Sequence, residues 1–212
     1  MGYITLKRVI DIFLSLFLLV LFSPIILFTT IAIKFTSPGP VFADTPKRVG
    51  KNGVLFYPYK FRSMVLNAHK LLTTDPKFRK LYEEYKKSSY KLYKDPRITS
   101  AGHFIRHHSI DEIPQLWNVL KGEMSIVGPR PYYPDELEEQ QKKYPQTKRL
   151  VDEVLSVKPG ITGVWQVSGR SDINFDKRIA LDAYYATNMS LWTDLGILLK
   201  TPWGMVSGKG AV

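Results

Sequence analysis

Two adjacent acids, Asp111 and Glu112, follow a serine where the pattern predicts the start of a helix. Ser109 with Glu112 three residues later has the form of a capping box, and Gly122 marks the expected end of that helix. Capping alone explains this pattern, because acids at a helix N-terminus interact favourably with the helix dipole. The same N–H groups also favour an ionised Asp111 and create a place for a phosphate. An ionised carboxylate beside a magnesium-binding carboxylate is what an aspartyl-phosphate mechanism requires.

Two arginines flank these acids along the chain. Arg106 lies shortly before Asp111, and Arg130 stands between Pro129 and Pro131, which leave its backbone little freedom. A planar guanidinium makes bidentate contacts with phosphate. A lone arginine more often belongs to a surface ion pair, but two arginines around an acid pair in a basic chain favour an anionic diphosphate substrate.

Other catalytic and metal-binding motifs are absent from the sequence. There is no Walker A loop, no GxGxxG and no GxSxG nucleophile elbow. His103, His107 and His108 match no zinc-binding spacing, so we interpret them as packing or interfacial residues. The chain has no cysteine, which excludes disulfides and thiolate metal sites.

The elements that position these residues include an apolar run at residues 12–33, which is long enough to cross a membrane. Its 22 residues would extend as a helix about 33 Å, against a hydrocarbon core of roughly 30 Å. Ser23-Pro24 lies at its midpoint, where the proline should bend the helix. Because Lys7, Arg8 and Lys34 place positive charge at both ends, we expect a hairpin that enters and leaves by the same face. A straight span is the alternative, since prolines also occur in transmembrane helices.

The positive charge is concentrated just after this run. Of the 30 basic residues 16 lie in residues 34–110, against 5 of the 19 acidic ones, and the whole chain of 212 residues carries a net charge of +11. Juxtamembrane lysines and arginines bind anionic lipid headgroups and favour the cytoplasmic side. Nucleic acid is disfavoured as a partner, because aromatic-basic RNA motifs and zinc spacings are missing. We therefore expect membrane lipids and an anionic substrate.

The rest of the chain predicts one α+β domain that is mainly helical. We expect strands at 41–42, 54–57 and 59–61 around a turn at 50–53, and two helices in 64–94 that are separated near Asp75-Pro76. Further helices are expected at 109–121, 134–155 and about 175–189, with an extended piece at 164–167. The apolar tail at 191–203 is either an interfacial amphipathic helix or a helix docked on the core.

Taken together, these segments resemble the bacterial sugar transferase family, the monotopic polyprenyl-phosphate phosphoglycosyltransferases. Each segment is modestly specific, but their ordered combination covers nearly the whole chain. The segments are KRVID at 7–11, Ser23-Pro24, YKFRSM at 59–64, DEIPQLWNVLKG at 111–122, SIVGPRP at 125–131, PGITG at 159–163 and QVSGR at 166–170. One departure is TPKR at 45–48, where many members have glutamine two residues before the arginine.

The resemblance implies a fold and a reaction. It implies a re-entrant membrane helix over residues 1–36, broken at Ser23 and Pro24, and a catalytic domain over residues 37–212 on the cytoplasmic face of the bacterial inner membrane. Many members carry further N-terminal membrane helices, and this chain is expected to be the catalytic domain alone. Members transfer a sugar 1-phosphate from a UDP-sugar to undecaprenyl phosphate and release UMP. This reaction initiates synthesis of exopolysaccharide, capsule or O-antigen.

The resemblance also implies roles for individual residues. Asp111 would be the nucleophile that forms a covalent phosphosugar intermediate, and Glu112 would be the ligand of Mg²⁺. The phosphate-binding residues would be Arg62, Arg106 and Arg130. The nucleotide-sugar pocket would be shaped by Pro159, Gly160, Thr162, Gly163, Gln166 and Arg170. The alternatives are a membrane glycosyltransferase that moves the sugar alone and releases UDP, and a non-catalytic scaffold at the membrane surface.

Overall fold

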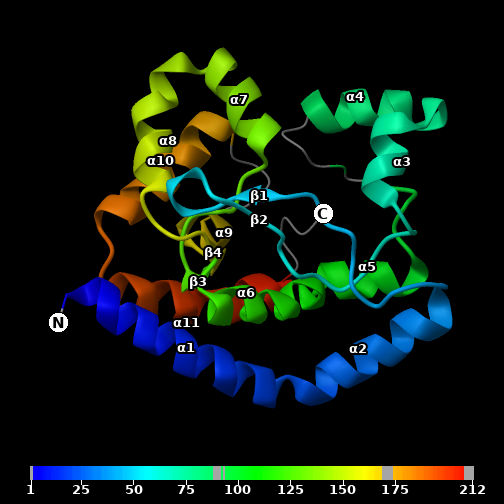
Figure 1. Ribbon diagram of the computed structural model, residues 1–212, viewed down its shortest axis with the longest axis horizontal. Helices are drawn as coiled ribbons and strands as arrows, with labels where there is room; N and C mark the ends of the chain where they lie inside the picture. Colours follow the sequence, from blue (N-terminus) through cyan, green and yellow to red (C-terminus); the bar gives the residue numbers. More distant parts are fainter. Residues whose placement is uncertain (1, 88–91, 93, 169–173, 208–212) are drawn as a thin grey trace.

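The protein is mainly helical, as the sequence predicts, and its described residues also form two small sheets (Figure 1). The computed structural model describes residues 2–87, 92, 94–168 and 174–207. The α-helices are α1 (Tyr3–Leu21), α2 (Ser23–Thr36), α3 (Ala68–Thr74), α4 (Arg79–Lys87), α5 (Ser100–His107), α6 (Leu116–Lys121), α7 (Pro134–Lys143), α8 (Lys148–Leu155), α9 (Val164–Val167), α10 (Phe175–Thr187) and α11 (Leu191–Ser207). The 3-10 helices are η1 (Lys51–Gly53), η2 (Pro76–Phe78), η3 (Ile110–Gln115) and η4 (Pro145–Thr147), and the strands are β1 (Arg48–Val49), β2 (Leu55–Phe56), β3 (Ser125–Val127) and β4 (Gly160–Thr162).

Each sheet has two strands. β1 and β2 form an antiparallel hairpin around the predicted turn, with Arg48 opposite Phe56, and Asn52 makes the turn with a φ of 56°. β1 itself was not predicted, and the segments 41–42 and 59–61, expected to be strands, form an isolated bridge between Phe42 and Phe61 instead. β3 and β4 pair in parallel, with Ser125 opposite Gly160 and residues 127 and 162 opposite each other. Sequence patterns predicted the hairpin turn but not the parallel pair, because strands of three residues are too short to show alternation.

Three predicted elements differ from the structure. The segment 164–167, expected to be extended, is the single helical turn α9, which buries Trp165. The helix expected at 134–155 is divided into α7 and α8 around Pro145, which begins η4. The helix expected at 109–121 is divided into η3 and α6, because Pro114 lies within the 3-10 segment. The break predicted at Asp75-Pro76 is confirmed, since α3 ends at Thr74.

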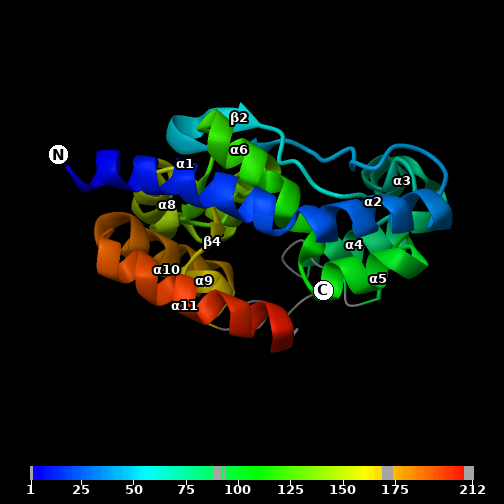
Figure 2. The same cartoon turned by 90° about the horizontal axis from the view of Figure 1, so that it is seen from below.

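Helices α1 and α2 form a bent pair along one side of the molecule (Figures 1 and 2). Among the described residues, no single helix has both the length and the apolar composition to cross a membrane, whereas α1 and α2 together, bent by 59°, meet both criteria. The bend lies at Phe22, and Ser23-Pro24 begins α2. Proline is tolerated there because the first turn of a helix has free N–H groups, so Pro24 ends one helix and starts the next.

The first half of α1 is fastened to the domain by charged side chains. Asp11 is 4% exposed, and it accepts hydrogen bonds from Ser125 Oγ (2.7 Å) and the Ile126 N–H (3.1 Å) of β3. Arg8 donates to the carbonyl oxygens of Val119 and Leu120, in the last turn of α6. These contacts satisfy carbonyls that a helix end leaves without partners.

A second attachment joins the start of α1 to α11. Lys7 Nζ lies 2.5 Å from Asp194 Oδ2, and the Tyr3 hydroxyl donates to the same oxygen. We interpreted Lys7 and Arg8 from the sequence as membrane-flanking charges. In the structure both are paired with protein groups, so their location reflects docking of the helix as much as membrane topology.

The end of α2 also contacts the domain. Ile33 is 2% exposed and packs in a cluster with Phe61 and Ile105. After the helix, Arg62 donates to the carbonyl oxygens of Ser37 and Pro38. Both ends of the bent pair are therefore bonded to the same domain.

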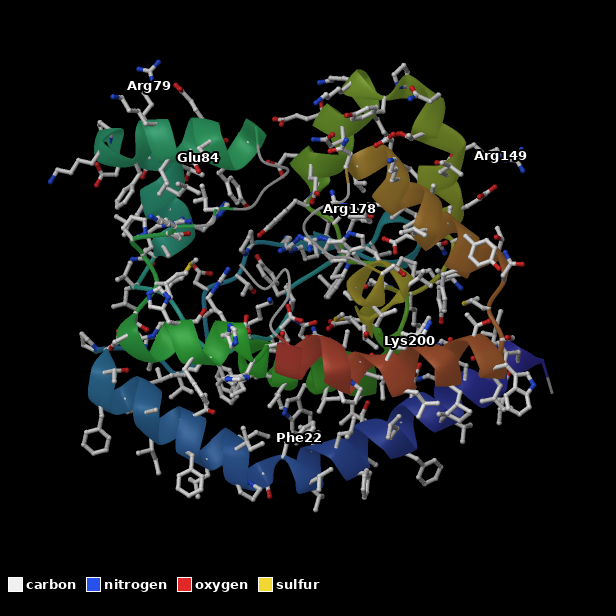
Figure 3. The ribbon with its side chains drawn as sticks, turned by 180° about the vertical axis from the view of Figure 1, so that it is seen from behind. Phe22, Arg79, Glu84, Arg149, Arg178 and Lys200 are labelled. Carbon is white, nitrogen blue, oxygen red and sulfur yellow. The ribbon has the colours of Figure 1, made fainter. Side chains whose placement is uncertain are left out.

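The opposite side of the bent pair is apolar and exposed. Phe13 is 69% exposed, Val20 75%, Phe28 70% and Phe35 87%, and aromatic side chains project outward from the pair in Figure 3. The tail helix α11 combines the two interpretations of the sequence. It buries Ile197 and Asp194 against the domain, and it exposes a stripe formed by Leu191, Trp192, Leu195 and Leu199.

The basic helices α3 and α4 lie across the domain from α1 and α2 (Figure 1), and Arg79 points outward there (Figure 3). From the sequence, the basic residues of 34–110 were assigned to lipid headgroups, but for α3 and α4 a solvated surface is the alternative. The position of these two helices favours the solvated surface.

Loss of the Asp11 carboxylate should destabilise the fold. In Asp11→Ala the Ile126 N–H and the Ser125 hydroxyl lose a buried acceptor, which costs about 1–3 kcal/mol for each group left without a partner. We expect a lower midpoint of thermal unfolding in detergent micelles. Phe13→Ala is the matched control, because Phe13 faces away from the domain on the same helix. Equal midpoints for the two variants would contradict this account of α1.

Candidate active site

Asp111 and Glu112 lie in η3, between α5 and α6. The predicted capping box is wrong: Ser109 makes no side-chain cap bond, and its backbone is left-handed with a φ of 55°. Instead, the Glu112 N–H donates to the Ser109 carbonyl (3.1 Å), which starts a 3-10 turn. The predicted helix end is confirmed, since Gly122 follows α6 with a φ of 84°. Asp111 is buried at 6% exposure, whereas the Glu112 side chain is 37% exposed.

A lysine from a distant segment contacts both carboxylates. Lys60 Nζ lies 2.6 Å from Glu112 Oε1 and 3.4 Å from Asp111 Oδ2. The neighbouring Phe61 N–H donates to the Asp111 carbonyl (3.0 Å), which holds residues 60 and 61 against η3. Sequence reasoning did not assign a role to Lys60. A signal was present, because Lys60 stands between Tyr59 and Phe61 in an alternating segment, which directs its side chain away from the buried Phe61.

The two carboxylates differ in their electrostatics. Burial raises the pKa of Asp111, and the charges of Lys60 and Arg106 offset this only in part, while Glu112 raises it further. Burial also acts to raise the pKa of Glu112, but Lys60, Arg130 and Arg48 outweigh it and lower that pKa. The pKa of Lys60 is raised despite burial, because both carboxylates favour its charged form. At neutral pH the site therefore holds an ionised Glu112 and a charged Lys60 beside a more buried Asp111.

The three arginines that were predicted to bind phosphate lie in different surroundings. The guanidinium of Arg106 is close enough to lower the pKa of Asp111, and that of Arg130 lowers the pKa of Glu112. The Arg130 guanidinium also lies over the ring of Trp165, with its carbon 4.9 Å from the ring centroid. Arg62 is 4% exposed and holds the turn after α2 through carbonyl contacts. Both Nη atoms of Arg62 thus bond to main-chain carbonyls, and phosphate binding by Arg62 stays a prediction.

The predicted nucleotide-sugar residues lie against the loop that carries Arg130. The Gly160 N–H donates to the Pro129 carbonyl (2.8 Å), and the Gly128 N–H donates to the Thr162 carbonyl (2.9 Å). A Cβ added at Gly160 would lie 2.1 Å from Gly128 N, so glycine is required for this close approach. The contacts show that β4 supports the Arg130 loop.

The remaining residues of this group lie near the same loop. Pro159 and Gly163 are buried, and Gly163 packs so tightly on Gly128 that an added Cβ would lie 2.1 Å from its carbonyl oxygen. Gln166 is half-buried on α9. Arg170 lies outside the described residues. The part these residues take in a nucleotide-sugar pocket stays a prediction.

Arg48 is a further residue that sequence reasoning missed. Its guanidinium lies over the Tyr133 ring, donates to the Pro131 carbonyl (3.0 Å) and lowers the pKa of Glu112. Nothing in the local pattern around residue 48 indicates that contact, because its partners lie more than 60 residues away.

The carboxylates suit magnesium in one respect. Magnesium in proteins is usually held by one or two carboxylates together with substrate phosphates and water. Asp111 and Glu112 supply such a pair, and no group of three or more metal-type ligands occurs in the part of the chain that the structure describes. Glu112 is the more exposed and the more readily ionised carboxylate. A bound cation would have to share it with Lys60.

The predicted packing role of the histidines is consistent with their ring contacts. The rings of His107 and His108 meet edge to face at 4.8 Å, and His108 also packs on Phe104.

The site therefore combines a buried carboxylate pair with cationic groups from several elements, in a helical protein with an exposed apolar helix pair. The chain matches the family model described as bacterial sugar transferase over residues 2–208. It belongs to the bacterial sugar transferase family, as the sequence motifs indicated.

Several named relatives share this similarity. The chain is 45% identical over 97% of its length to the undecaprenyl-phosphate galactose phosphotransferase of Salmonella typhimurium, of which it covers 41%. It is 41% identical over 97% of its length to the exopolysaccharide production protein ExoY of Rhizobium meliloti, of which it covers 87%. It is 38% identical over 99% of its length to the UDP-N-acetylgalactosamine-undecaprenyl-phosphate N-acetylgalactosaminephosphotransferase of Aeromonas hydrophila, of which it covers 45%. The chain thus spans less than half the length of two of these relatives and most of the length of ExoY.

Removal of the Lys60 charge should raise the pKa values of both carboxylates. In Lys60→Met the ionised forms of Asp111 and Glu112 lose their nearest positive charge. We expect both titrations to move to higher pH in a carbon-13 NMR titration of the labelled carboxyl groups. Lys121→Met is the control, because Lys121 pairs with Glu123 instead. Unchanged titrations in Lys60→Met would contradict the electrostatic role of Lys60.

Proposed function

We propose that the chain transfers a sugar 1-phosphate from a UDP-sugar to undecaprenyl phosphate and releases UMP. The observation that carries this proposal is the buried Asp111 carboxylate beside Glu112, in contact with Lys60 and close to Arg106 and Arg130. The names of the Salmonella and Aeromonas relatives support the substrate classes. The ExoY relative supports a place in exopolysaccharide production.

The reaction proceeds in two displacements at one phosphorus atom. In the first, an Asp111 carboxylate oxygen attacks the sugar-proximal phosphorus, and the bond from that phosphorus to the bridging oxygen breaks, so that UMP leaves with the electron pair. In the second, an oxygen of undecaprenyl phosphate attacks the same phosphorus and the bond to Asp111 breaks. The products are UMP, a polyprenyl-diphosphosugar and the regenerated carboxylate.

The surrounding groups lower the cost of bringing anions together. Arg106 and Arg130 would bind the phosphates and neutralise charge on the transferring group. Lys60 keeps a positive charge at the carboxylates before the donor arrives. Mg²⁺, held by Glu112 together with the diphosphate, would supply Lewis-acid stabilisation of the leaving UMP. A covalent intermediate lets a soluble donor and a lipid acceptor react at the same site in turn.

Isotope exchange tests the two-step reaction. With no lipid acceptor present, labelled UMP should enter the UDP-sugar pool in the presence of the protein, and mass spectrometry should detect a phosphosugar on Asp111. Asp111→Asn should abolish exchange, because the amide is a much weaker nucleophile than a carboxylate. Asp152→Asn is the matched control, since Asp152 is an exposed aspartate of α8.

The identity of the released nucleotide distinguishes the proposed reaction from that of a glycosyltransferase that moves the sugar alone. If turnover with undecaprenyl phosphate released UDP, the chain would move the sugar alone and the proposed reaction would be wrong. UMP could also be released on turnover with neither isotope exchange nor a phosphosugar on Asp111. The reaction would then be a single displacement, and the covalent step would be excluded.

We further propose that α1 and α2 form a re-entrant hairpin that holds the domain on the cytoplasmic face of the membrane. Two observations support this. The start of α1 is bonded to Asp194, and the end of α2 packs on Phe61, so both ends contact one domain. The outer side of the pair and the exposed stripe of α11 supply apolar surface for the acyl chains and the interface.

Single-cysteine labelling tests the hairpin, because the native chain contains no cysteine. Thr5→Cys, at the exposed start of α1, and Lys51→Cys, in the β1–β2 turn, should both react with a membrane-impermeant maleimide in inside-out vesicles. Neither should react in right-side-out vesicles. Labelling of residue 5 from the outer face alone would establish a straight span.

A further inference from the structure

The loop that carries Arg130 has very few main-chain donors. Residues 129 and 131 are prolines, which have no N–H, so the Arg130 N–H is the single main-chain donor between them. This N–H donates to Asp182 Oδ2 of α10 (3.2 Å). The same oxygen accepts the Tyr132 hydroxyl (2.7 Å). One carboxylate oxygen therefore fixes the residues on both sides of Pro131.

Among the described residues, the side chain of Asp182 forms hydrogen bonds with this loop alone. It is 0% exposed, and its other oxygen, Oδ1, has no hydrogen-bond partner among the described residues. Burial raises the pKa of Asp182 to about 6, against the lowering effects of the Tyr132 hydrogen bond and the nearby arginines. A buried carboxylate with an unused oxygen disfavours folding. Its presence at this position is better explained by what it holds than by stability.

Aromatic and cationic groups complete the support of the loop. Tyr132 is 1% exposed and packs edge to face on Phe175. The Trp165 ring lies under Arg130, and it also meets the guanidinium of Arg178, which is buried and paired with Glu136. In Figure 3, Arg178 of α10 lies in the interior of the domain. The backbone of Arg130 is thus fixed by Asp182, and its guanidinium packs on the ring of Trp165, which is itself in contact with Arg178.

We propose that Asp182 is a positioning residue for Arg130: by accepting the Arg130 N–H and the Tyr132 hydroxyl, it aims the guanidinium at the phosphates of the nucleotide. This inference rests on the proposed role of Arg130 in binding the donor. Asp182 does not touch the substrate, and it acts only through the loop. Its contribution to binding should therefore disappear when the Arg130 side chain is removed.

A double-mutant cycle tests this dependence. Binding of UDP with magnesium is measured by calorimetry for the unmodified chain, Asp182→Ala, Arg130→Ala and the double variant. We expect each single variant to weaken UDP binding by roughly tenfold or more, as for loss of one hydrogen bond to a charged group. The double variant should be no weaker than Arg130→Ala, because both changes remove the same interaction.

Further variants separate positioning from loss of structure. Asp182→Asn keeps an oxygen acceptor at the same place, and we expect it to retain part of the UDP affinity even if Asp182→Ala does not fold. Thr187→Ala, on the same helix, is the control, because its hydroxyl donates to the α10 carbonyls of Ala183 and Tyr184 and accepts from the side-chain amide of Asn188, none of which belongs to the Arg130 loop. Thermal unfolding is recorded for every variant, and Thr187→Ala should bind UDP as the unmodified chain does.

The outcomes distinguish the two proposals. If Arg130→Ala weakens UDP binding but Asp182→Ala and Asp182→Asn do not, positioning by Asp182 is wrong while the proposed function stands. An additive loss in the double variant would also overturn the inference, because Asp182 would then act elsewhere. If Arg130→Ala binds UDP normally, the phosphate role of Arg130 fails, and the positioning role fails with it.

Discussion

The contact of Lys60 with Asp111 and Glu112 is the interaction on which the site depends. Carboxylates on successive residues repel each other and lose hydration in a partly buried segment unless a positive charge lies close by. Lys60 supplies this charge from 51 residues earlier in the chain, and the Phe61 N–H fixes the register that brings it there. Arg106 and Arg130 add positive charge around the same acids. The anionic diphosphate of the proposed donor would therefore meet fixed cations instead of two unshielded carboxylates.

The same segments are tied to the helix pair that we assign to the membrane. Asp11 of α1 binds β3, which leads into the Arg130 loop, while Arg8 caps α6, which continues from the segment of Asp111. Helix α1 thus fixes both the Arg130 loop and the Asp111 segment at a set distance from its own exposed apolar side. This coupling explains why the Asp11 carboxylate stands at the edge of an apolar run, where hydrocarbon would disfavour it.

Local patterns predicted most elements, and they failed where distant contacts decide the backbone. Pro24 and Pro76 each lie in the first turn of a new helix, as their sequence positions predicted, because a missing N–H and a fixed φ act within one turn. Residues 164–167 were expected to be extended, yet they form a helical turn that buries Trp165 beside the Arg130 guanidinium. Ser109 was expected to cap a helix, but its backbone is left-handed and Pro114 lies within the 3-10 segment that follows, whose Asp111 carbonyl accepts the Phe61 N–H. In the same way, Lys60, Arg48 and Asp182 gave no local signal strong enough to assign them to the site.

The sequence by itself determined the family, the acid pair, the break in the apolar run and the concentration of basic residues, since each depends on residue types at short spacing. The tertiary structure alone decided which cation meets the acids, that Arg62 holds a turn, and that Lys7 and Arg8 bind the domain. It also brought Asp182 to the loop of Arg130 from 52 residues away. The physical reason is that burial and electrostatic pairing depend on distances in space, and the chain sets these distances only when it folds.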